Sequence, residues 1–381
     1  MTDRRALVAV VCLFLIWGGA DAQEVDFRGQ AAASFVSSDA DARQLRADFR
    51  YQPDLTVSVP VGASSDLTGF VAGEFLYSSR IWSLDTAEGE GEASLYRMWL
   101  RYSGSRSELR VGRQKISFGS ATLLRPLMWF DSIDPRDPLQ LTAGVDGALV
   151  RMFFDNNANI WAWCLYGNEE PKGWDALPTV EDEVEYGGRV QWPLGNGEIA
   201  ATYHHRVADL GALADSLPPG SGIRAPEDRV ALDGKWDLTV GVWFEAVLVH
   251  QDYDLLTRPW GRIGAVGIDY TFGIGDGLTT VVEYLASGDS EEAFGSGDLT
   301  DYSAFSLLYP WGVVDEFSLI VNYDWENEDW YNFLEWRRTY DRWSFHLMGF
   351  ANPAEAAETP VLMGGGLLSG TGVRLLVAFN H

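Results

Sequence analysis

The sequence predicts an all-β fold: a transmembrane, antiparallel, up-and-down β-barrel of about 18 strands (roughly 16 to 18). Three observations support this prediction. Apolar and polar side chains alternate along most of the chain after Gln23, no helical period of comparable length competes with this alternation, and the connections between strands are sorted by length.

The alternation is clear near the C-terminal end. Phe317, Leu319 and Val321 are apolar, whereas Ser318 and Asn322 between them are polar. A period of two places one row of side chains on each face of a strand. Because the apolar row is rich in aromatic residues and the other row carries the charges, we expect lipid on the outer face and water on the inner face.

Runs of this kind predict strands in the following order: 24–37, 43–60, 67–80, 92–103, 106–116, 144–154, 158–167, 184–193, 197–207, 228–237, 240–252, 261–272, 277–287, 301–309, 315–326, 329–340, 342–351 and 368–380. From the fourth strand on, short turn-forming connections alternate with long ones. This is typical of barrels with short periplasmic turns and long extracellular loops. A soluble β-sandwich could show the same alternation of apolar and polar side chains, but short and long connections are not expected to alternate along its chain. Two connections, near Asp39 and at 327–329, are short where the scheme expects long ones.

Residues 1–22 have the features of a signal peptide. Arg4 and Arg5 precede an apolar stretch at 6–17, and Ala20-Asp21-Ala22 offers a small-x-small cleavage pattern. The apolar stretch is shorter than the ~20 residues of a membrane-spanning helix. We therefore expect a signal peptide at 1–22 and a bacterial outer-membrane barrel at 23–381.

The chain is strongly acidic, with a net charge of -27 from 55 acidic and 28 basic residues. This excess argues against nucleic acid as a partner. Cleavage would leave Cys164 as the one cysteine, so an internal disulfide is not expected. No cofactor is expected, and we do not expect an enzyme: His204 and His205 stand beside neither a nucleophile-bearing turn nor metal-spaced ligands.

Basic side chains gather in the row opposite the apolar one. If the apolar row faces lipid, they border a water-filled pore and attract anions. The alternative is that each arginine pairs with a nearby acid and braces the wall. The candidate pore-lining residues are Arg97, Arg101, Arg110, Arg113, Lys115, Arg151, Arg189, His204, Arg206, Arg337 and Arg374.

The segment around Gly112 changes the side-chain parity. Leu109 and Val111 predict one outward-facing row, whereas Ile116 and Phe118 predict the other. A β-bulge beside Gly112 would supply the slip of one residue and turn the two basic side chains that follow it into the lumen. The alternative is that these side chains extend to the membrane rim.

The connection at about 117–143 is the longest, and it is too apolar to remain in water. We expect it to fold into the barrel mouth and narrow the channel. Its acids could coordinate calcium, but an Asp before a Pro more often forms a turn, so no metal site is predicted. The candidate constriction residues are Leu123, Leu124, Trp129, Phe130, Asp131, Asp134 and Asp137.

Tryptophan is abundant, with 16 residues in the chain. Many lie near the predicted strand ends, including Trp129, Trp163, Trp192, Trp311 and Trp330. Indole prefers the membrane–water boundary, which predicts an aromatic girdle. Ordinary hydrophobic core is the alternative.

The centre of the chain resembles a known family. Gly112-Arg113-Gln114, then Phe118-Gly119, a long loop and a return strand at 145–148 are similar to the middle of Gram-negative porins of the alginate-export type; other substrate-selective porins have similar stretches. The resemblance implies an eighteen-stranded monomeric barrel whose positively charged constriction passes anionic saccharides or acids. One departure is that Phe379 is followed by Asn380 and His381, whereas such barrels usually end in an aromatic residue.

We therefore expect an outer-membrane porin that passes small hydrophilic solutes by passive diffusion and prefers anionic ones. The alternatives are an outer-membrane conduit for polysaccharide export and a plugged structural or adhesive surface barrel. The expected partners are outer-membrane lipid and lipopolysaccharide, the barrel-assembly machinery, and small anionic or saccharide solutes. The pattern fits a monomer and a trimer equally.

Overall fold

The computed structural model describes residues 24–40, 45–83, 86–211, 222–253, 255–295, 297–354 and 368–381. The expected signal peptide at 1–22 lies outside these residues. The strands are β1 (Glu24–Ser38), β2 (Leu45–Gly62), β3 (Ser65–Ser83), β4 (Thr86–Ser103), β5 (Ser107–Gln114), β6 (Val145–Phe153), β7 (Asn159–Tyr166), β8 (Val184–Leu194), β9 (Gly197–Asp209), β10 (Arg224–Asp237), β11 (Gly241–Gln251), β12 (Trp260–Phe272), β13 (Leu278–Ser290), β14 (Thr300–Trp311), β15 (Asp315–Asp324), β16 (Asp329–Thr339), β17 (Trp343–Ala351) and β18 (Thr371–Asn380).

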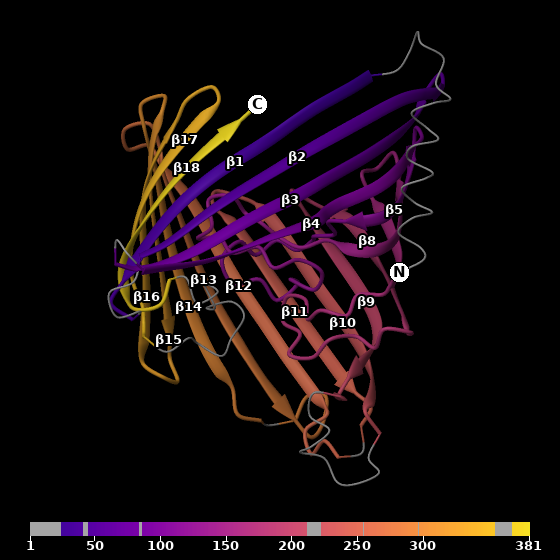
Figure 1. Ribbon diagram of the computed structural model, residues 1–381. Helices are drawn as coiled ribbons and strands as arrows, with labels where there is room; N and C mark the ends of the chain where they lie inside the picture. The colour runs from indigo at the N-terminus through magenta and orange to yellow at the C-terminus, as the bar shows by residue number, and fades with distance from the viewer. Residues whose placement is uncertain are drawn as a thin grey trace.

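The 18 strands form one closed sheet. Each strand pairs antiparallel with its neighbours in sequence, and β1 also pairs with β18, with Ala33 opposite Val377 (Figure 1). Closure leaves no strand edge with unpaired backbone groups. The predicted all-β barrel is confirmed.

Among the described residues, no helix has the length and the apolar composition needed to cross a membrane.

The two faces of the wall differ as the alternation predicts. On β8, Val190 and Trp192 are exposed to the outside, and the neighbouring strand β9 buries Thr202 and His204 on the inside. The same division continues around the sheet, where exposed large apolar side chains occupy the outward row. The outer surface of the barrel is therefore apolar, and the inner surface carries the polar side chains.

Connection length differs between the two rims. The connection that follows each even-numbered strand is short, and these connections form the short-turn rim. The connections that follow the odd-numbered strands form the long-loop rim. One predicted loop, at 81–91, is largely strand instead, because β3 and β4 continue to Ser83 and Thr86. The residues of β3 and β4 pair across this hairpin, and Arg80 lies opposite Glu88.

The bulge predicted beside Gly112 is wrong. β5 pairs with β4 and β6 without a register shift through Gly112, and the irregular position lies on β4, where Tyr96 is skipped in the pairing with β3. Gly112 has φ +118°, and a Cβ there would lie 2.2 Å from the Met98 carbonyl oxygen. Ile116 and Phe118 are buried inside the barrel rather than facing lipid, because the chain leaves the wall after Gln114.

The predicted tryptophan girdle is present in part. The exposed tryptophans are Trp192, Trp311, Trp325, Trp330 and Trp343. The buried ones are Trp129, Trp163 and Trp243. The second group packs against segments that enter the barrel, so these residues belong to the interior.

Candidate pore and constriction

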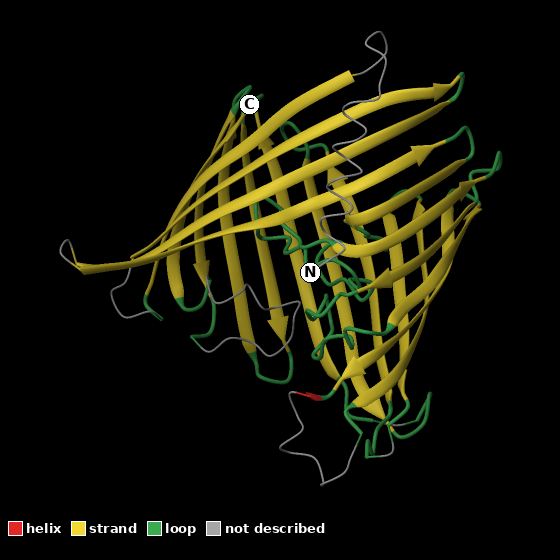
Figure 2. Cartoon of the chain, turned by 45° about the vertical axis from the view of Figure 1, so that its right-hand side comes forward, coloured by secondary structure: helices red, strands yellow, loops and turns green. Residues whose placement is uncertain are grey.

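Residues 115–144 connect β5 to β6 and lie within the barrel (Figure 2). A wall carboxylate holds the first part of this segment. Glu245 of β11 is 1% exposed and accepts the backbone N–H groups of Ser120 at 2.5 Å, Ala121 at 2.8 Å and Leu127 at 3.0 Å. Buried backbone N–H groups require acceptors, so these three hydrogen bonds fix the segment to the inner wall.

A second wall carboxylate holds the next residues. Glu283 of β13 accepts the N–H groups of Thr122 at 2.7 Å, Leu123 at 3.0 Å and Leu124 at 2.5 Å. The indole of Trp243 also donates to Glu283, at 3.0 Å. The segment has no regular secondary structure here, and these two side chains supply the acceptors that its buried N–H groups require.

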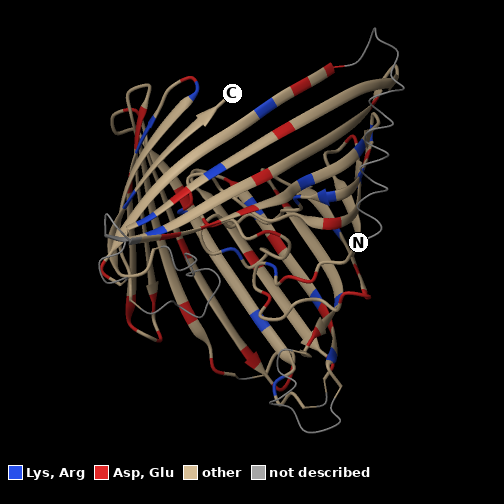
Figure 3. Ribbon diagram, in the orientation of Figure 1, with Lys and Arg blue, Asp and Glu red and all other residues tan. Residues whose placement is uncertain are grey.

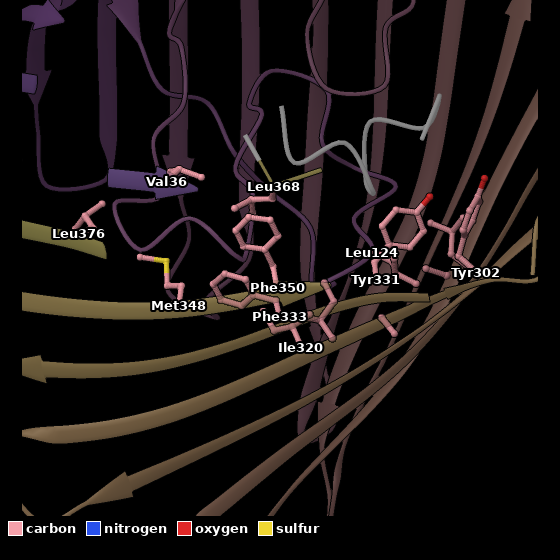
Figure 4. Packing of buried hydrophobic residues seen from close by; sticks show 14 of the residues in the cluster. Val36, Leu124, Tyr302, Ile320, Tyr331, Phe333, Met348, Phe350, Leu368 and Leu376 are labelled. Atoms are coloured by element: carbon pink, nitrogen blue, oxygen red, sulfur yellow. The ribbon is translucent and has the colours of Figure 1, made fainter. Parts of the chain in front are cut away.

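Apolar packing holds the same segment from its other side. Leu123 and Leu124 join a buried cluster built from β12 to β18 and β1, which includes Tyr302, Phe333 and Phe350 (Figure 4). A second cluster contains Ile116, Phe118, Leu127, Trp129, Phe130, Val145, Leu149, Trp163, Leu165, Ala231 and Val247. Together the clusters cover the inner wall from β6 to β18.

The three acids of this segment form turns and ion pairs. Asp131 pairs with Arg125 at 2.6 Å. Asp134 accepts the N–H of Arg136 at 2.8 Å, and Asp137 accepts that of Leu141 at 3.2 Å. These are the local contacts expected of an Asp beside a Pro. In the described part of the chain, no group of three or more His, Cys, Asp or Glu residues could hold a metal ion.

A second segment, 167–183 between β7 and β8, also contacts the interior. Trp174 donates its indole N–H to the Arg125 carbonyl at 2.8 Å, and Lys172 pairs with Glu185 of β8 at 2.7 Å. Gly173 has φ +54°, and a Cβ there would lie 1.5 Å from the Met128 carbonyl oxygen. The two segments are therefore packed directly against each other.

We expect Gly173→Ala to separate these segments. The substitution combines a positive φ with a backbone clash, each of which costs about 1–3 kcal/mol. The midpoint of urea unfolding in detergent micelles should fall. Gly195→Ala is the control, because Gly195 has a similar φ of +63° but nothing within 4 Å of its Cβ position. Equal destabilisation by both substitutions would contradict the contact between the segments.

Charged residues under the second segment form a buried network. Asp175 is buried and pairs with Arg206 at 3.0 Å and with Arg229. Glu227 pairs with both arginines and also accepts a hydrogen bond from Gln251 at 2.7 Å. All four ionic side chains are almost fully buried, so their charges are neutralised by one another rather than by water.

Two further candidate residues have buried partners nearby. Arg189 of β8 forms two hydrogen bonds with Asp233 of β10, at 2.6 and 2.8 Å. His204 accepts the indole N–H of Trp163 at Nδ1, 3.2 Å away, and its Nε2 lies 3.3 Å from Glu185. Arg189, His204 and Arg206 therefore brace the wall, as the alternative interpretation holds.

Three candidates lie in the inward row of β4, β5 and β6. Arg110 pairs with Glu108 at 3.1 Å, and Arg151 reaches the same carboxylate at 3.8 Å. Arg101 contacts Asp66 at 4.0 Å. Since one carboxylate serves two guanidinium groups, this part of the wall keeps an excess of positive charge.

Arg97 differs from these residues because its two hydrogen bonds go to carbonyl oxygens. It donates to Thr142 O at 2.6 Å and to Tyr96 O at 3.1 Å, and its guanidinium lies 4.3 Å from the centre of the Tyr96 ring. The contact with Thr142 ties the end of the 115–144 segment to β4.

The remaining candidates are dispersed. Arg113 continues the row of Leu109 and Val111, which is exposed on the outer face, and pairs with Asp146 at 2.6 Å. Lys115 is exposed just beyond β5. Two others face the lumen elsewhere: Arg337 pairs with Glu316 at 2.5 Å, and Arg374 lies 3.8 Å from Asp137.

The sequence analysis did not single out Glu245, although its surroundings carry a signal. Glu245 interrupts the apolar run of β11, and an unpaired carboxylate in such a run requires donors from elsewhere in the fold. Arg50 of β2 lies in the inward row, is 8% exposed and pairs with Glu74 at 2.5 Å.

Two cavities lie against the inner rows of β2, β3 and β4. The one nearer the long-loop rim has a volume of about 660 Å³ and is lined by Arg46, Arg80 and Glu88, among others. The one nearer the short-turn rim has a volume of about 460 Å³ and is lined by Gln52 and Leu139, among others. This part of the inner wall is thus left open by the two inward segments.

Solved structures with the same architecture are outer-membrane proteins. OccAB4 of Acinetobacter baumannii aligns with a TM-score of 0.59 at 10% identity, over 94% of this chain and 98% of that one. OccK5 of Pseudomonas aeruginosa aligns at 0.57 and 10% identity, over 95% and 99%. OmpT of Vibrio cholerae aligns at 0.50 and 12% identity, over 95% and 99%. No family model and no curated protein matches the chain.

Identity at this level concerns the fold alone. The agreement extends over nearly the whole length of both chains. The chain has the β-barrel fold of the outer-membrane porins.

Proposed function

We propose that the protein is an outer-membrane porin that passes small hydrophilic solutes by passive diffusion and favours anions. The observation that carries this proposal is the closed 18-stranded barrel with an apolar outer row, a charged inner row and cavities against the inner wall. A barrel of this strand number is wide enough for an aqueous channel. The segments at 115–144 and 167–183 would act as the constriction.

The anion preference rests on the inward rows of β2 to β6. Arg97 has no carboxylate among its hydrogen-bond partners, and Arg110 and Arg151 share Glu108. When the wall around a channel has a low dielectric constant, an excess of guanidinium groups along it attracts anions and repels cations. The apolar outer face supports an outer-membrane location and contact with lipopolysaccharide as parts of this proposal.

Planar-bilayer recording tests the proposal. The purified full chain should form open channels of ohmic conductance. In a tenfold KCl gradient the reversal potential should have the sign expected for a channel that is more permeable to Cl⁻ than to K⁺. A reversal potential of the opposite sign would contradict the anion preference. An absence of conductance would contradict the porin function itself.

A plugged surface barrel is the second candidate function, and one observation favours it. Two segments and two apolar clusters occupy the interior along β6 to β18. Bilayers that stay silent with a correctly folded barrel, shown by its protease resistance in detergent, would support this candidate.

A further inference from the structure

The open part of the lumen lies on one side of the barrel. Glu245 and Glu283 hold the 115–144 segment on β11 and β13, and the buried ion pairs hold the 167–183 segment on β8 to β10. A buried apolar cluster lies on the inner face of β12 to β18 beside Leu123 and Leu124. On the inner rows of β2 to β4, the 115–144 segment contacts Arg97 through the Thr142 carbonyl oxygen, and its Leu139 and Leu141 line one of the two cavities.

Different stretches of the same three strands line the two cavities of this wall. On β2 the inward row runs through Arg46, which lines the larger cavity, to Gln52, which lines the smaller one. On β3 the inward row runs from Ser78, which lines the larger cavity, to Ala72, which lines the smaller one. One cavity therefore lies above the other, and the strand positions between them form the neck.

Arg50 and Glu74 occupy this neck. On β3 Glu74 is the inward-facing residue between the two cavities, and it forms an ion pair with Arg50 at 2.5 Å. On β2 Arg50 shares this interval with Asp48, which pairs with Arg46 at 2.9 Å. Tyr96, the bulged residue of β4, places its ring 5.5 Å from the guanidinium of Arg50 and 4.3 Å from that of Arg97. Charged groups of both signs follow these strands on either side of the neck (Figure 3).

The neck holds unused hydrogen-bonding capacity. Arg50 is 8% exposed, and its Nη1 atom has no hydrogen-bond partner among the described residues. Arg97 is 6% exposed and donates to carbonyl oxygens alone. Two guanidinium groups face one carboxylate, that of Glu74, which leaves one positive charge in excess. A buried donor without an acceptor is costly unless a ligand supplies one.

We infer that solutes pass along the β2–β4 wall rather than along the barrel axis, and that Arg50 and Arg97 form a subsite for a small monovalent oxyanion at its neck. This inference rests on the proposed porin function. A planar oxyanion matches the fork of donors on a guanidinium group. A monoanion leaves the occupied neck electrically neutral, whereas a dianion would leave it with an uncompensated negative charge beside Glu74. Leu139 and Leu141 of the inward segment line the same cavity and would contact the apolar part of the solute.

Charge removal tests the subsite. Arg50→Gln and Arg97→Gln should each reduce the Cl⁻/K⁺ permeability ratio by about tenfold, because a unit charge roughly 6 Å from the passing ion in water changes the permeation of each ion by about threefold and acts on Cl⁻ and K⁺ with opposite signs. Arg337→Gln is the matched control, because it removes a lumenal arginine that is also paired with a glutamate but lies on β16. A ratio that falls equally in all three variants, or in the control alone, would overturn the inference.

Saturation tests the ligand class. In potassium acetate the conductance of the wild-type channel should level off with concentration, and in Arg97→Gln it should rise linearly. Phosphate at a pH where it is a dianion should show no such saturation. Saturation by the dianion, or saturation that persists in Arg97→Gln, would overturn the monovalent subsite.

Cysteine labelling tests the path. In a Cys164→Ser background, Gln52→Cys and Ser78→Cys should lose conductance when an anionic methanethiosulfonate reagent is added. Ser318→Cys, in the inward row of β15, should not. A larger loss at 318 would overturn the path while leaving the porin function in place. A wild-type protein that folds but does not conduct would overturn both.

Discussion

Glu283→Gln should release the constriction segment and raise single-channel conductance. The Glu283 carboxylate accepts the N–H groups of three successive residues, Thr122 to Leu124, and an indole N–H. An amide keeps one acceptor oxygen and places an NH₂ group against the remaining donors. Hydrogen bonds to charged groups contribute ~1.5–3 kcal/mol each, so loss of two should cost about 3–6 kcal/mol of the free energy that holds the segment in place.

Two measurements check this expectation. Conductance and current noise in planar bilayers should both increase, and a protease should cut the 115–144 segment while the wall stays intact. Glu335→Gln is the matched control, since Glu335 is also a mostly buried lumenal carboxylate but contacts wall residues, with His346 at 2.7 Å. Unchanged conductance and unchanged protection in Glu283→Gln would show that apolar packing alone holds the segment.

Asp175→Asn should strongly destabilise the second inward segment. Asp175 pairs with Arg206 and Arg229, and the side chains of all three are almost fully buried. Removing one partner of a buried ion pair costs about 3–5 kcal/mol, because it leaves an uncompensated charge away from water. The temperature at which the folded barrel converts to its slower-migrating unfolded form on a gel should fall accordingly.

An exposed ion pair gives the reference for this prediction. Asp155 pairs with Arg106 at 2.7 Å, but their side chains are 78% and 67% exposed. Asp155→Asn should therefore cost less than ~1 kcal/mol. If Asp175→Asn were as mild as Asp155→Asn, Glu227 alone would be sufficient to neutralise the two arginines.

The strands could be predicted because their signal is local. The alternation from Phe317 to Asn322 predicts that this stretch is a strand and which of its faces points outward. The structure places Ile320 and Asn322 on the inner face. Where the chain leaves the wall the same rule fails. Ile116 and Phe118 follow the alternation in sequence, yet they pack on Trp129 and Trp163 within the barrel.

The charged contacts could not be predicted from the sequence in the same way. Asp175 belongs to an acidic stretch that resembles an exposed loop, and its arginine partners lie on β9 and β10. Sequence reasoning identified Arg189 and Arg206 as inward-facing but could not tell whether they line water or meet a carboxylate. That outcome depends on which segment covers them once the barrel is closed.

The sequence by itself determined the barrel, the division of its wall into apolar and charged faces, and the alternation of short and long connections. Each of these features depends on side chains that are only a few residues apart in the sequence. The tertiary structure decided where the lumen stays open. Glu245 and Glu283 meet the 115–144 segment across more than a hundred residues of sequence, and these contacts exist only after closure has brought the strands around it. Their hydrogen bonds hold the segment on β11 and β13, and two cavities lie against the inner rows of β2 to β4.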